Sequence, residues 1–319
     1  MGVGMKIAVL FPGQGSQYIG MGQEFITSDS DCAAVMAEAE SVCDFPLGKI
    51  CQEGPMEELT RAVYLQPAIT VTNLVCWQAV RKALGEKPAV SCFAGHSLGE
   101  YSALYAAGVL SLADTIRLVA KRGALMEREG LKNPGGMRAI LGLGVEEVEA
   151  IITWYNGRGV VTAANHNTET QIVISGEEQA MDAVSAKAAE QGGKVIPLNV
   201  SVANHSPLVA DAVPDFAAFM AGVEFREPQT PVFFNVTATV ERDVNLIKEM
   251  MARQIASRVR WFEIINGMIA QGVDTFIEIG PKTVLKGLMK KIVPKGYAYT
   301  ALQVDSPETL AACIARLAE

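Results

Sequence analysis

Histidines are few in this sequence and no cysteines are paired by spacing, which excludes the common metal motifs. The 319 residues contain three histidines, His96, His166 and His205, and six cysteines. No two cysteines form a C-x-x-C pair, and none lies at zinc-finger spacing from a histidine, as structural zinc sites require. We expect no metal, and we interpret the cysteines as free thiols in a reducing cytoplasm.

Long hydrophobic runs and net positive charge are also missing. No apolar run reaches the ~18 residues that would span a membrane, and the first run, at 7–11, is too short for the core of a signal peptide. The net charge is −8, so no overall positive field would attract nucleic acid. We therefore expect a cytoplasmic protein that binds neither membrane nor nucleic acid. An acidic partner would need a local basic patch.

What the sequence does contain is a regular alternation of strand-like and helical segments. Half of the residues are hydrophobic, which is enough for a sizeable core. The apolar patterns predict strands at 6–11, 90–95, 231–236 and 274–280 and helices at 30–43, 66–84 and 111–129. Near-continuous apolar strands separated by helices are typical of a parallel sheet that is covered on both faces.

A second pattern begins at a Pro/Gly break at 131–137. Residues 134–199 have the pattern strand, helix, strand, strand, helix, strand, which is the ferredoxin-like order. We expect this segment to be an inserted subdomain, and residues 1–133 and 200–319 to form one catalytic core. The expected fold class is α/β.

The stretch FAGHSLGEYSAL places Ser97 between two glycines, after a predicted strand and before a predicted helix. This Gly-x-Ser-x-Gly context is that of a nucleophile elbow, a tight turn that lifts the serine oxygen out of the fold. The alternative interpretation is a glycine-rich turn around a packed serine.

A nucleophilic serine needs a base, and His205 is the best placed of the three histidines. It follows Ser97 in sequence, where the chain re-enters the core, whereas His96 adjoins the serine and points elsewhere, and His166 falls in a polar loop of the subdomain. No Asp or Glu between serine and histidine stands in a telling motif. A dyad in which a backbone carbonyl holds His205 fits as well as a triad, and Gln254 is a candidate for that orienting group.

Acyl transfer also requires N–H donors for the oxyanion. One is expected from Leu98, the residue after the nucleophile. The second is expected from Gln14, in the glycine-containing loop FPGQGSQYIGMG after the first strand. The rival interpretation of that loop is a phosphate cradle, which is weaker because no Gly-Lys-Ser/Thr follows.

Five segments appear in order along the chain: LFPGQGSQYIGMG, GHSLGEYSAL, AKRGALM, ANHSPL and FIEIGPKTVLKGL. Together they closely resemble the malonyl-CoA:acyl-carrier-protein transacylases of bacterial fatty-acid synthesis and the acyltransferase domains of polyketide synthases. The resemblance implies an α/β-hydrolase-like core with an inserted ferredoxin-like subdomain. It also implies transfer of a malonyl group from malonyl-CoA to the phosphopantetheine thiol of holo acyl carrier protein, by a ping-pong mechanism through a malonyl-serine. No cofactor besides the coenzyme A thioester substrate is implied.

The resemblance also assigns roles to single residues. Ser97 takes the malonyl group, His205 is the base, and the forked guanidinium of Arg122 binds the malonyl carboxylate. From spacing alone, Arg122 would be a surface arginine on the helix at 111–129. The remaining assignments are the oxyanion residues Gln14 and Leu98, the base-orienting Gln254, and Asn204 and Gln66 in the substrate pocket.

Two positions depart from the family. Asn204, just before the base, is neither the aromatic residue that accompanies malonyl nor the small residue that accompanies methylmalonyl, so tolerance for a branched acyl group stays open. Lys282 stands where relatives more often have glycine, away from the motif chemistry. The alternatives to a fatty-acid enzyme are a discrete acyltransferase of a polyketide assembly line, an editing hydrolase, which commonly lacks the arginine, and a carrier-binding scaffold with an inactive site.

Acyl carrier proteins are acidic, so docking to this acidic chain requires a basic patch. Lys282, Lys286 and Lys290 fall on one helical face by their i, i+4 spacing. Such a stripe would steer the carrier toward the site, and an ordinary solvated helix face explains it equally well. We expect the chain to act as a monomer.

Overall fold

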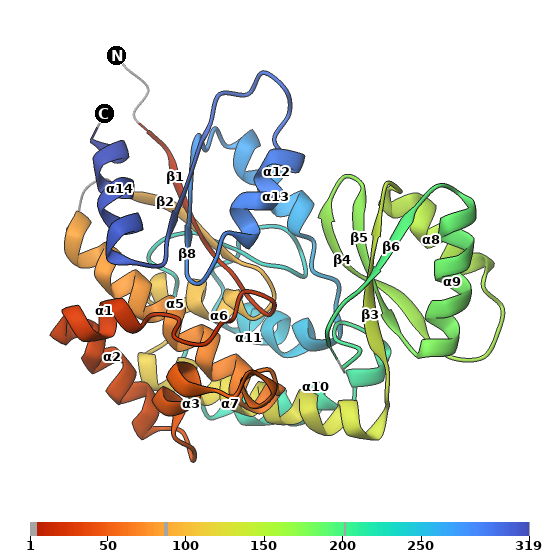
Figure 1. Cartoon of the computed structure of the whole chain (residues 1–319), viewed down its shortest axis with the longest axis horizontal. Coiled ribbons are helices and arrows are strands. Elements are labelled where there is room, and N and C mark those ends of the chain that lie inside the picture. The colour runs from red at the N-terminus through yellow and green to blue at the C-terminus, as the bar shows by residue number, and fades with distance from the viewer. Residues whose placement is uncertain (1–4, 86–88, 201, 319) are drawn as a thin grey trace.

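A five-stranded parallel sheet lies at the centre of the larger part of the molecule (Figure 1). The computed structural model describes residues 5–85, 89–200 and 202–318. In sheet order the strands are β7 (Val232–Phe233), β2 (Val90–Gly95), β1 (Ile7–Phe11), β8 (Thr275–Ile279) and β9 (Thr300–Val304). The first four match predicted strands, although β7 is much shorter than expected, and β9 is an additional strand.

Helices cover both faces of this sheet. The core helices are α1 (Gln23–Ser28), α2 (Ser30–Ser41), α3 (Leu47–Glu53), α4 (Met56–Leu59), α5 (Ala62–Leu84), α6 (Gly99–Ala106), α7 (Leu112–Lys132), α10 (Ala212–Ala221), α11 (Val244–Arg253), α12 (Trp261–Ala270), α13 (Val284–Ile292) and α14 (Pro307–Leu317), with short 3₁₀ turns η1 (Pro207–Val209) and η2 (Gln254–Ala256). Alternate residues of β1 enter two hydrophobic clusters, one shared with α5 and α7 and the other with α12 and α13. The strand sequences are almost continuously apolar because both faces of the sheet are buried, as predicted.

A separate antiparallel sheet forms the smaller part of the molecule, on the right in Figure 1. Its elements are β3 (Gly136–Leu141), α8 (Val145–Trp154), β4 (Val161–Thr168), β5 (Gln171–Gly176), α9 (Glu178–Glu190) and β6 (Lys194–Pro197), in the strand order β4-β5-β3-β6. This is the predicted sequence of elements, and it encloses a hydrophobic cluster of its own. The fold is thus mixed α/β with one parallel and one antiparallel sheet, and the subdomain bounds of 134–199 stay a prediction.

Backbone hydrogen bonds join β4 to the core segment that precedes α12. The N–H of His166 donates to Val259 O, and the N–H of Val259 donates to Ala164 O, both at 2.9 Å. The prediction of a polar loop around His166 is wrong, because β4 continues through this residue and buries it to 6% exposure. Pairing with the core stabilises the polar end of this strand, a long-range effect that local composition does not reveal.

The expected lysine stripe is also partly wrong. Lys282 precedes α13, which begins at Val284, and has a positive φ of 65°, so it cannot share a helical face with Lys286 and Lys290. Glycine adopts this left-handed conformation without steric cost, which explains why the family more often has glycine at this position.

Two further properties of the described residues bear on the expectations. All six cysteines are unpaired, as expected. Among the helices of the described ranges, none has both the length and the apolar character needed to cross a bilayer.

Candidate active site

The predicted elbow is present between β2 and α6, and the serine carries its strain. Ser97 has a φ of 50°, in the left-handed region. The two flanking glycines are required for close approach, because a Cβ on Gly95 would lie 1.9 Å from the carbonyl carbon of Gly99 and a Cβ on Gly99 would lie 2.1 Å from Phe11 O. Strand and helix therefore meet so tightly that only glycine fits on either side of the serine.

Asn235, two residues after the end of the neighbouring strand β7, holds the elbow. Its Oδ1 accepts the N–H of Ser97 at 2.7 Å, and its Nδ2 donates to Gly95 O at 2.8 Å. The sequence analysis did not single out this residue. Its position near the end of the predicted strand at 231–236 was the available signal, because functional side chains gather where parallel strands end.

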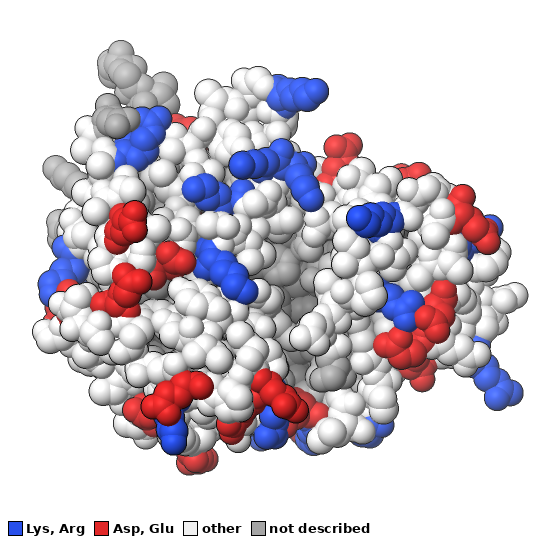
Figure 2. All heavy atoms as spheres, viewed as in Figure 1, with Lys and Arg blue, Asp and Glu red and all other residues white. Residues whose placement is uncertain are grey.

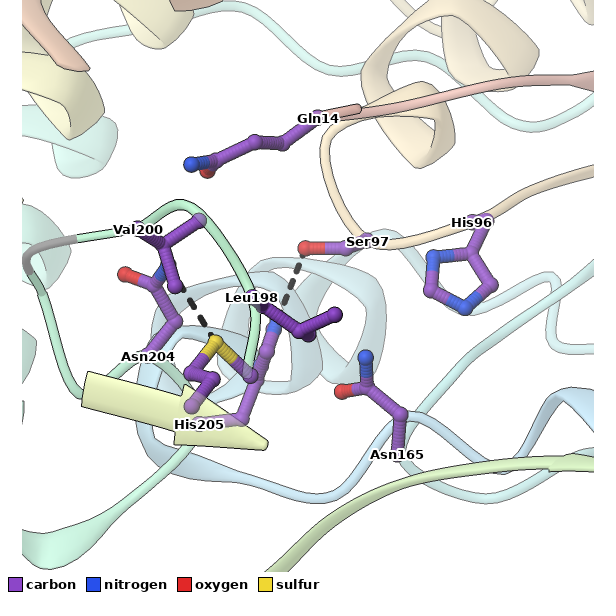
Figure 3. Close-up of a pocket in the computed structure, with 9 residues that line it drawn as sticks. Gln14, His96, Ser97, Asn165, Leu198, Val200, Asn204 and His205 are labelled. Atoms are coloured by element: carbon purple, nitrogen blue, oxygen red, sulfur yellow. Dashed lines mark hydrogen bonds between the residues drawn. The ribbon is translucent and has the colours of Figure 1, made fainter. Parts of the chain in front are cut away.

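Ser97 and His205 form a hydrogen-bonded pair, as Figure 3 shows. Ser97 Oγ lies 2.7 Å from His205 Nε2, and His205 Nδ1 lies 3.0 Å from both Gln254 O and Ser257 O. Two carbonyl acceptors fix the proton on Nδ1, so the lone pair of Nε2 faces the serine hydroxyl. Burial, with the nearby charge of Arg122, lowers the pKa of His205 to about 3, and the imidazole is neutral and available as a base.

Arg122 is buried beside the serine, contrary to the surface position that spacing alone predicts. It is 1% exposed. Its Nη2 donates to Gln254 Oε1 at 3.0 Å and to Ser97 Oγ at 3.3 Å, and its Nη1 donates to Gln66 Oε1 at 2.9 Å. The guanidinium also lies over the ring of Tyr101, 5.8 Å from its centroid. Arg122, Gln66 and Gln254 thus form one buried cluster with the nucleophile.

The side chain of Gln254 connects this cluster to a buried carboxylate that the sequence analysis missed. Its Nε2 donates to Ser97 O at 2.8 Å and to Glu100 Oε2 at 2.6 Å. The other oxygen of Glu100 accepts the N–H of Asn235 at 2.7 Å. Burial raises the pKa of Glu100, and these donors together with Arg122 oppose that rise. Gln254 therefore acts through its side chain as well as through the predicted main-chain carbonyl.

The two expected oxyanion donors lie on adjoining loops. Gly13 packs against the elbow so closely that a Cβ would lie 2.5 Å from His96 O and 3.5 Å from Leu98 N. Within the described ranges, no hydrogen bond uses the backbone N–H of Gln14 or Leu98. Both donors are thus available to a ligand, and their role stays a prediction.

A cavity of about 80 Å³ opens over the serine (Figure 3). It is lined by Gln14, His96, Ser97, Met137, Asn165, Leu198, Val200, Asn204 and His205. A second cavity of about 230 Å³ shares Gln14, Asn204 and the 198–200 segment with it and extends to Thr60 and Ala62. The site therefore lies between core and antiparallel subdomain, with Asn204 at the junction of the two cavities. His96 points away from the base, with its Nε2 2.8 Å from Asn167 Oδ1.

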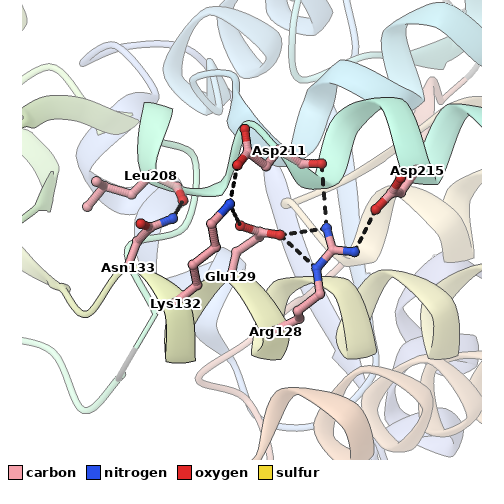
Figure 4. Close-up of polar contacts among 7 residues, drawn as sticks. All are labelled: Arg128, Glu129, Lys132, Asn133, Leu208, Asp211 and Asp215. Carbon is pink, nitrogen blue, oxygen red and sulfur yellow. Dashed lines mark hydrogen bonds and ion pairs between the residues drawn. The ribbon is translucent and has the colours of Figure 1, made fainter.

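Polar contacts fix the segment that follows His205 to the end of α7, the helix that carries Arg122 (Figure 4). Arg128, Lys132 and Asn133 on one side contact Leu208, Asp211 and Asp215 on the other, and Glu129 pairs with Arg128 and Lys132 on its own helix. Glu129 is 1% exposed and pairs with Arg128 at 2.5 Å. These contacts connect the last turns of α7 with the start of α10.

The lysines expected to bind a carrier belong to two different segments. Lys282 Nζ is 3.4 Å from Gly15 O, so this residue contacts the loop that carries Gln14. The expectation that Lys282 lies away from the motif residues is therefore wrong. Lys286 and Lys290 lie on α13. Among the described residues, no three His, Cys, Asp or Glu side chains gather where they could hold a metal ion.

Comparison with known proteins gives a consistent family. The acyl transferase domain model matches residues 9–306. The malonyl CoA-acyl carrier protein transacylase of Bacillus subtilis is 40% identical over 316 residues, covering 98% of each chain. The structure of the malonyl CoA-acyl carrier protein transacylase from Coxiella burnetii has a TM-score of 0.93 at 34% identity, covering 99% of this chain and 98% of that one.

A structure of a type II PKS acyl-carrier protein in complex with its malonyl-transacylase gives a TM-score of 0.92 at 36% identity, covering 98% of this chain and 99% of that one. These matches extend over nearly the whole chain and include both sheets. The resemblance predicted from the five sequence segments is confirmed, and the chain belongs to the acyl transferase domain family.

Proposed function

We propose that this protein is an acyltransferase that moves a malonyl group from malonyl-CoA to the phosphopantetheine thiol of acyl carrier protein. The observation that carries the proposal is the buried guanidinium of Arg122, 3.3 Å from Ser97 Oγ. A malonyl group on the serine has its free carboxylate two bonds beyond the ester carbonyl, within reach of that guanidinium. A buried arginine pairs strongly with a carboxylate and finds no partner in an acetyl group.

In the first half-reaction, the hydroxyl of Ser97 attacks the thioester carbonyl while His205 Nε2 takes its proton. The N–H groups of Leu98 and Gln14 receive the oxyanion. The tetrahedral intermediate collapses with loss of the coenzyme A thiolate, to which His205 returns the proton. The second half-reaction reverses these steps with the carrier thiol as nucleophile, which regenerates the free serine.

Fatty-acid synthesis is the pathway that we favour, because the relative from Bacillus subtilis is named a malonyl CoA-acyl carrier protein transacylase and is matched end to end. A discrete acyltransferase of a polyketide assembly line is the second candidate, supported by the similarity to the type II PKS malonyl-transacylase complex. An editing hydrolase is disfavoured by Arg122, since such relatives commonly lack the arginine.

The finer expectations from the sequence belong to the same proposal. We propose an α/β-hydrolase-like core, which the strand–elbow–helix arrangement around Ser97 supports. We propose docking of the acidic carrier near α13, where Lys and Arg side chains gather above the hollow in Figure 2. Reaction without metal or cofactor, a monomeric state and a cytoplasmic location stay predictions.

The proposal is tested by intact-protein mass spectrometry after mixing with malonyl-CoA, followed by holo carrier protein or buffer alone. We expect a malonyl adduct on Ser97 that persists in buffer and moves to the carrier. An adduct lost equally fast in buffer contradicts transfer and indicates a hydrolase. Absence of any adduct on the folded protein contradicts the malonyl substrate.

A further inference from the structure

Glu100 is a buried carboxylate with no step in the proposed mechanism. It lies on the first turn of α6, three residues after the nucleophile, and is 1% exposed. Burying a charged group is costly unless hydrogen bonds or a counter-charge compensate for it. Both of its oxygens accept hydrogen bonds, one from the backbone N–H of Asn235 and the other from Nε2 of Gln254. A carboxylate suits this position because each of its two oxygens is an acceptor.

The amide of Gln254 stands between Glu100 and Arg122. It donates through Nε2 to Glu100 and to Ser97 O, and it accepts through Oε1 from Arg122. Neither Glu100 nor Arg122 makes an ion pair with any of the described residues. The carboxyl group of Glu100 is therefore linked to the guanidinium through one intervening amide, and the guanidinium has no direct carboxylate partner among the described residues.

We propose that Glu100 is a positioning residue that sets the orientation of the Gln254 amide and thereby keeps Arg122 ready for a carboxylate on the acyl group. An acceptor at position 100 requires Nε2 of Gln254 to face it, which turns Oε1 toward Arg122. A donor at position 100 favours the reversed amide, which would present an N–H group to the guanidinium and an oxygen to Ser97 O. The selectivity of the site thus depends on a residue that does not contact the acyl group. The inference rests on the proposed malonyl transfer.

The test compares loading of Ser97 from malonyl-CoA and from acetyl-CoA in Glu100→Gln. This variant keeps the shape of the side chain, but its amide has only one oxygen to accept hydrogen bonds. The backbone N–H of Asn235 requires that oxygen on its own side. The NH₂ group of the new amide must therefore face Gln254. Because the reversed amide would place an N–H group against the guanidinium in place of an acceptor, we expect the malonyl-to-acetyl ratio of kcat/KM to fall about ten- to hundredfold.

Glu100→Asp is the conservative variant, because its carboxylate can still accept from both donors. Its rates are expected to fall while its malonyl preference stays near that of the wild type. Glu129→Gln is the matched control, a carboxylate equally buried on α7 but outside this cluster. It should lower the melting temperature without moving the ratio.

An unchanged malonyl-to-acetyl ratio in Glu100→Gln overturns the proposal. An equal fall of kcat/KM for malonyl-CoA and acetyl-CoA leaves that ratio unchanged and would mark a merely structural role. If Glu100→Gln does not fold, Glu100→Asp decides: retained preference supports the proposal and lost preference overturns it. Loading of the wild type is read in the same assay. Failure of the wild type to take malonyl contradicts the proposed function itself and is distinct from failure of the inference.

Discussion

The two reacting residues, Ser97 and His205, both adopt left-handed backbone conformations, with φ of 50° and 58°. Such conformations cost about 1 kcal/mol or more for residues with a Cβ and persist only where neighbours enforce them. Here Asn235 accepts the N–H of Ser97, and Ile255 O accepts the N–H of His205 at 3.0 Å. The hydrogen bond between serine and histidine is thus set by the backbone before substrate arrives.

The low pKa of His205 predicts an unusual pH dependence. The base acts in its neutral form, and its pKa of about 3 keeps it neutral from pH 8 down to about pH 5. An imidazole with the ordinary pKa of ~6.5 would lose about thirtyfold of its base form at pH 5. We therefore expect no fall of kcat/KM for malonyl loading centred near pH 6.5. Circular dichroism at each pH serves as the control for folding, and a fall centred near pH 6.5 contradicts the prediction.

Removal of the Arg122 guanidinium should shift the substrate preference from malonyl-CoA toward acetyl-CoA. In Arg122→Ala, loss of a buried charge partner worth ~2–5 kcal/mol should lower kcat/KM for malonyl-CoA at least about thirtyfold, while acetyl transfer improves. The measurement is competitive loading of Ser97 from the two donors. Arg128→Ala on the same helix is the matched control, because Arg128 is 47% exposed and remote from the serine. Acyl selectivity equal to that of the wild type would refute the role of Arg122.

Local patterns predicted the elements around the site well, because each signal lay within one segment. The strand before Ser97, the helix after it and the order of elements in 134–199 all follow from apolar spacing and glycine positions. The same patterns could not predict that Arg122 is buried. Its burial depends on α5, which begins at Ala62 and packs against α7 so that Gln66 meets the guanidinium.

The crossing of α5 and α7 depends on one glycine. A Cβ on Gly123 would lie 2.4 Å from Ala62 O, a backbone atom that moves only with its helix. We expect Gly123→Ala to destabilise the protein by about 1–3 kcal/mol, despite the better helix propensity of alanine. Thermal unfolding measures the effect, and malonyl loading should fall as well, because the neighbouring Arg122–Gln66 contact shifts.

Gly287→Ala is the control for that experiment. Gly287 lies within α13, and no atom lies within 4 Å of the position its Cβ would take. Alanine should therefore stabilise the protein there by about 0.5–1 kcal/mol. Stabilisation by Gly123→Ala, or an equal loss of stability in both variants, would show that steric contact between α5 and α7 does not limit the crossing.

At the scale of the whole molecule, the sequence could predict a net charge but not the contacts between residues that lie far apart in the chain. Asn235 meets Ser97 across 138 residues, and Lys282 meets Gly15 across 267; neither contact leaves a local pattern. The wrong helical placement of Lys282 has the same origin, since α13 begins where Glu278 accepts the N–H groups of Leu285 and Lys286. Only the tertiary fold defines where that helix begins.

The lysines of α13 offer the last prediction, since a chain of net charge −8 must attract an acidic carrier locally. Charge reversal in Lys286→Glu with Lys290→Glu should raise the KM for holo carrier protein several-fold and leave that for malonyl-CoA unchanged, because electrostatic steering acts mainly on association. The difference should shrink at about 0.5 M salt, where the screening length falls to a few ångströms. Lys49→Glu with Lys187→Glu, on α3 and α9, changes the net charge equally and should leave both KM values unchanged. Equal effects of the two pairs, or an equal rise for malonyl-CoA, would place the carrier elsewhere on the surface.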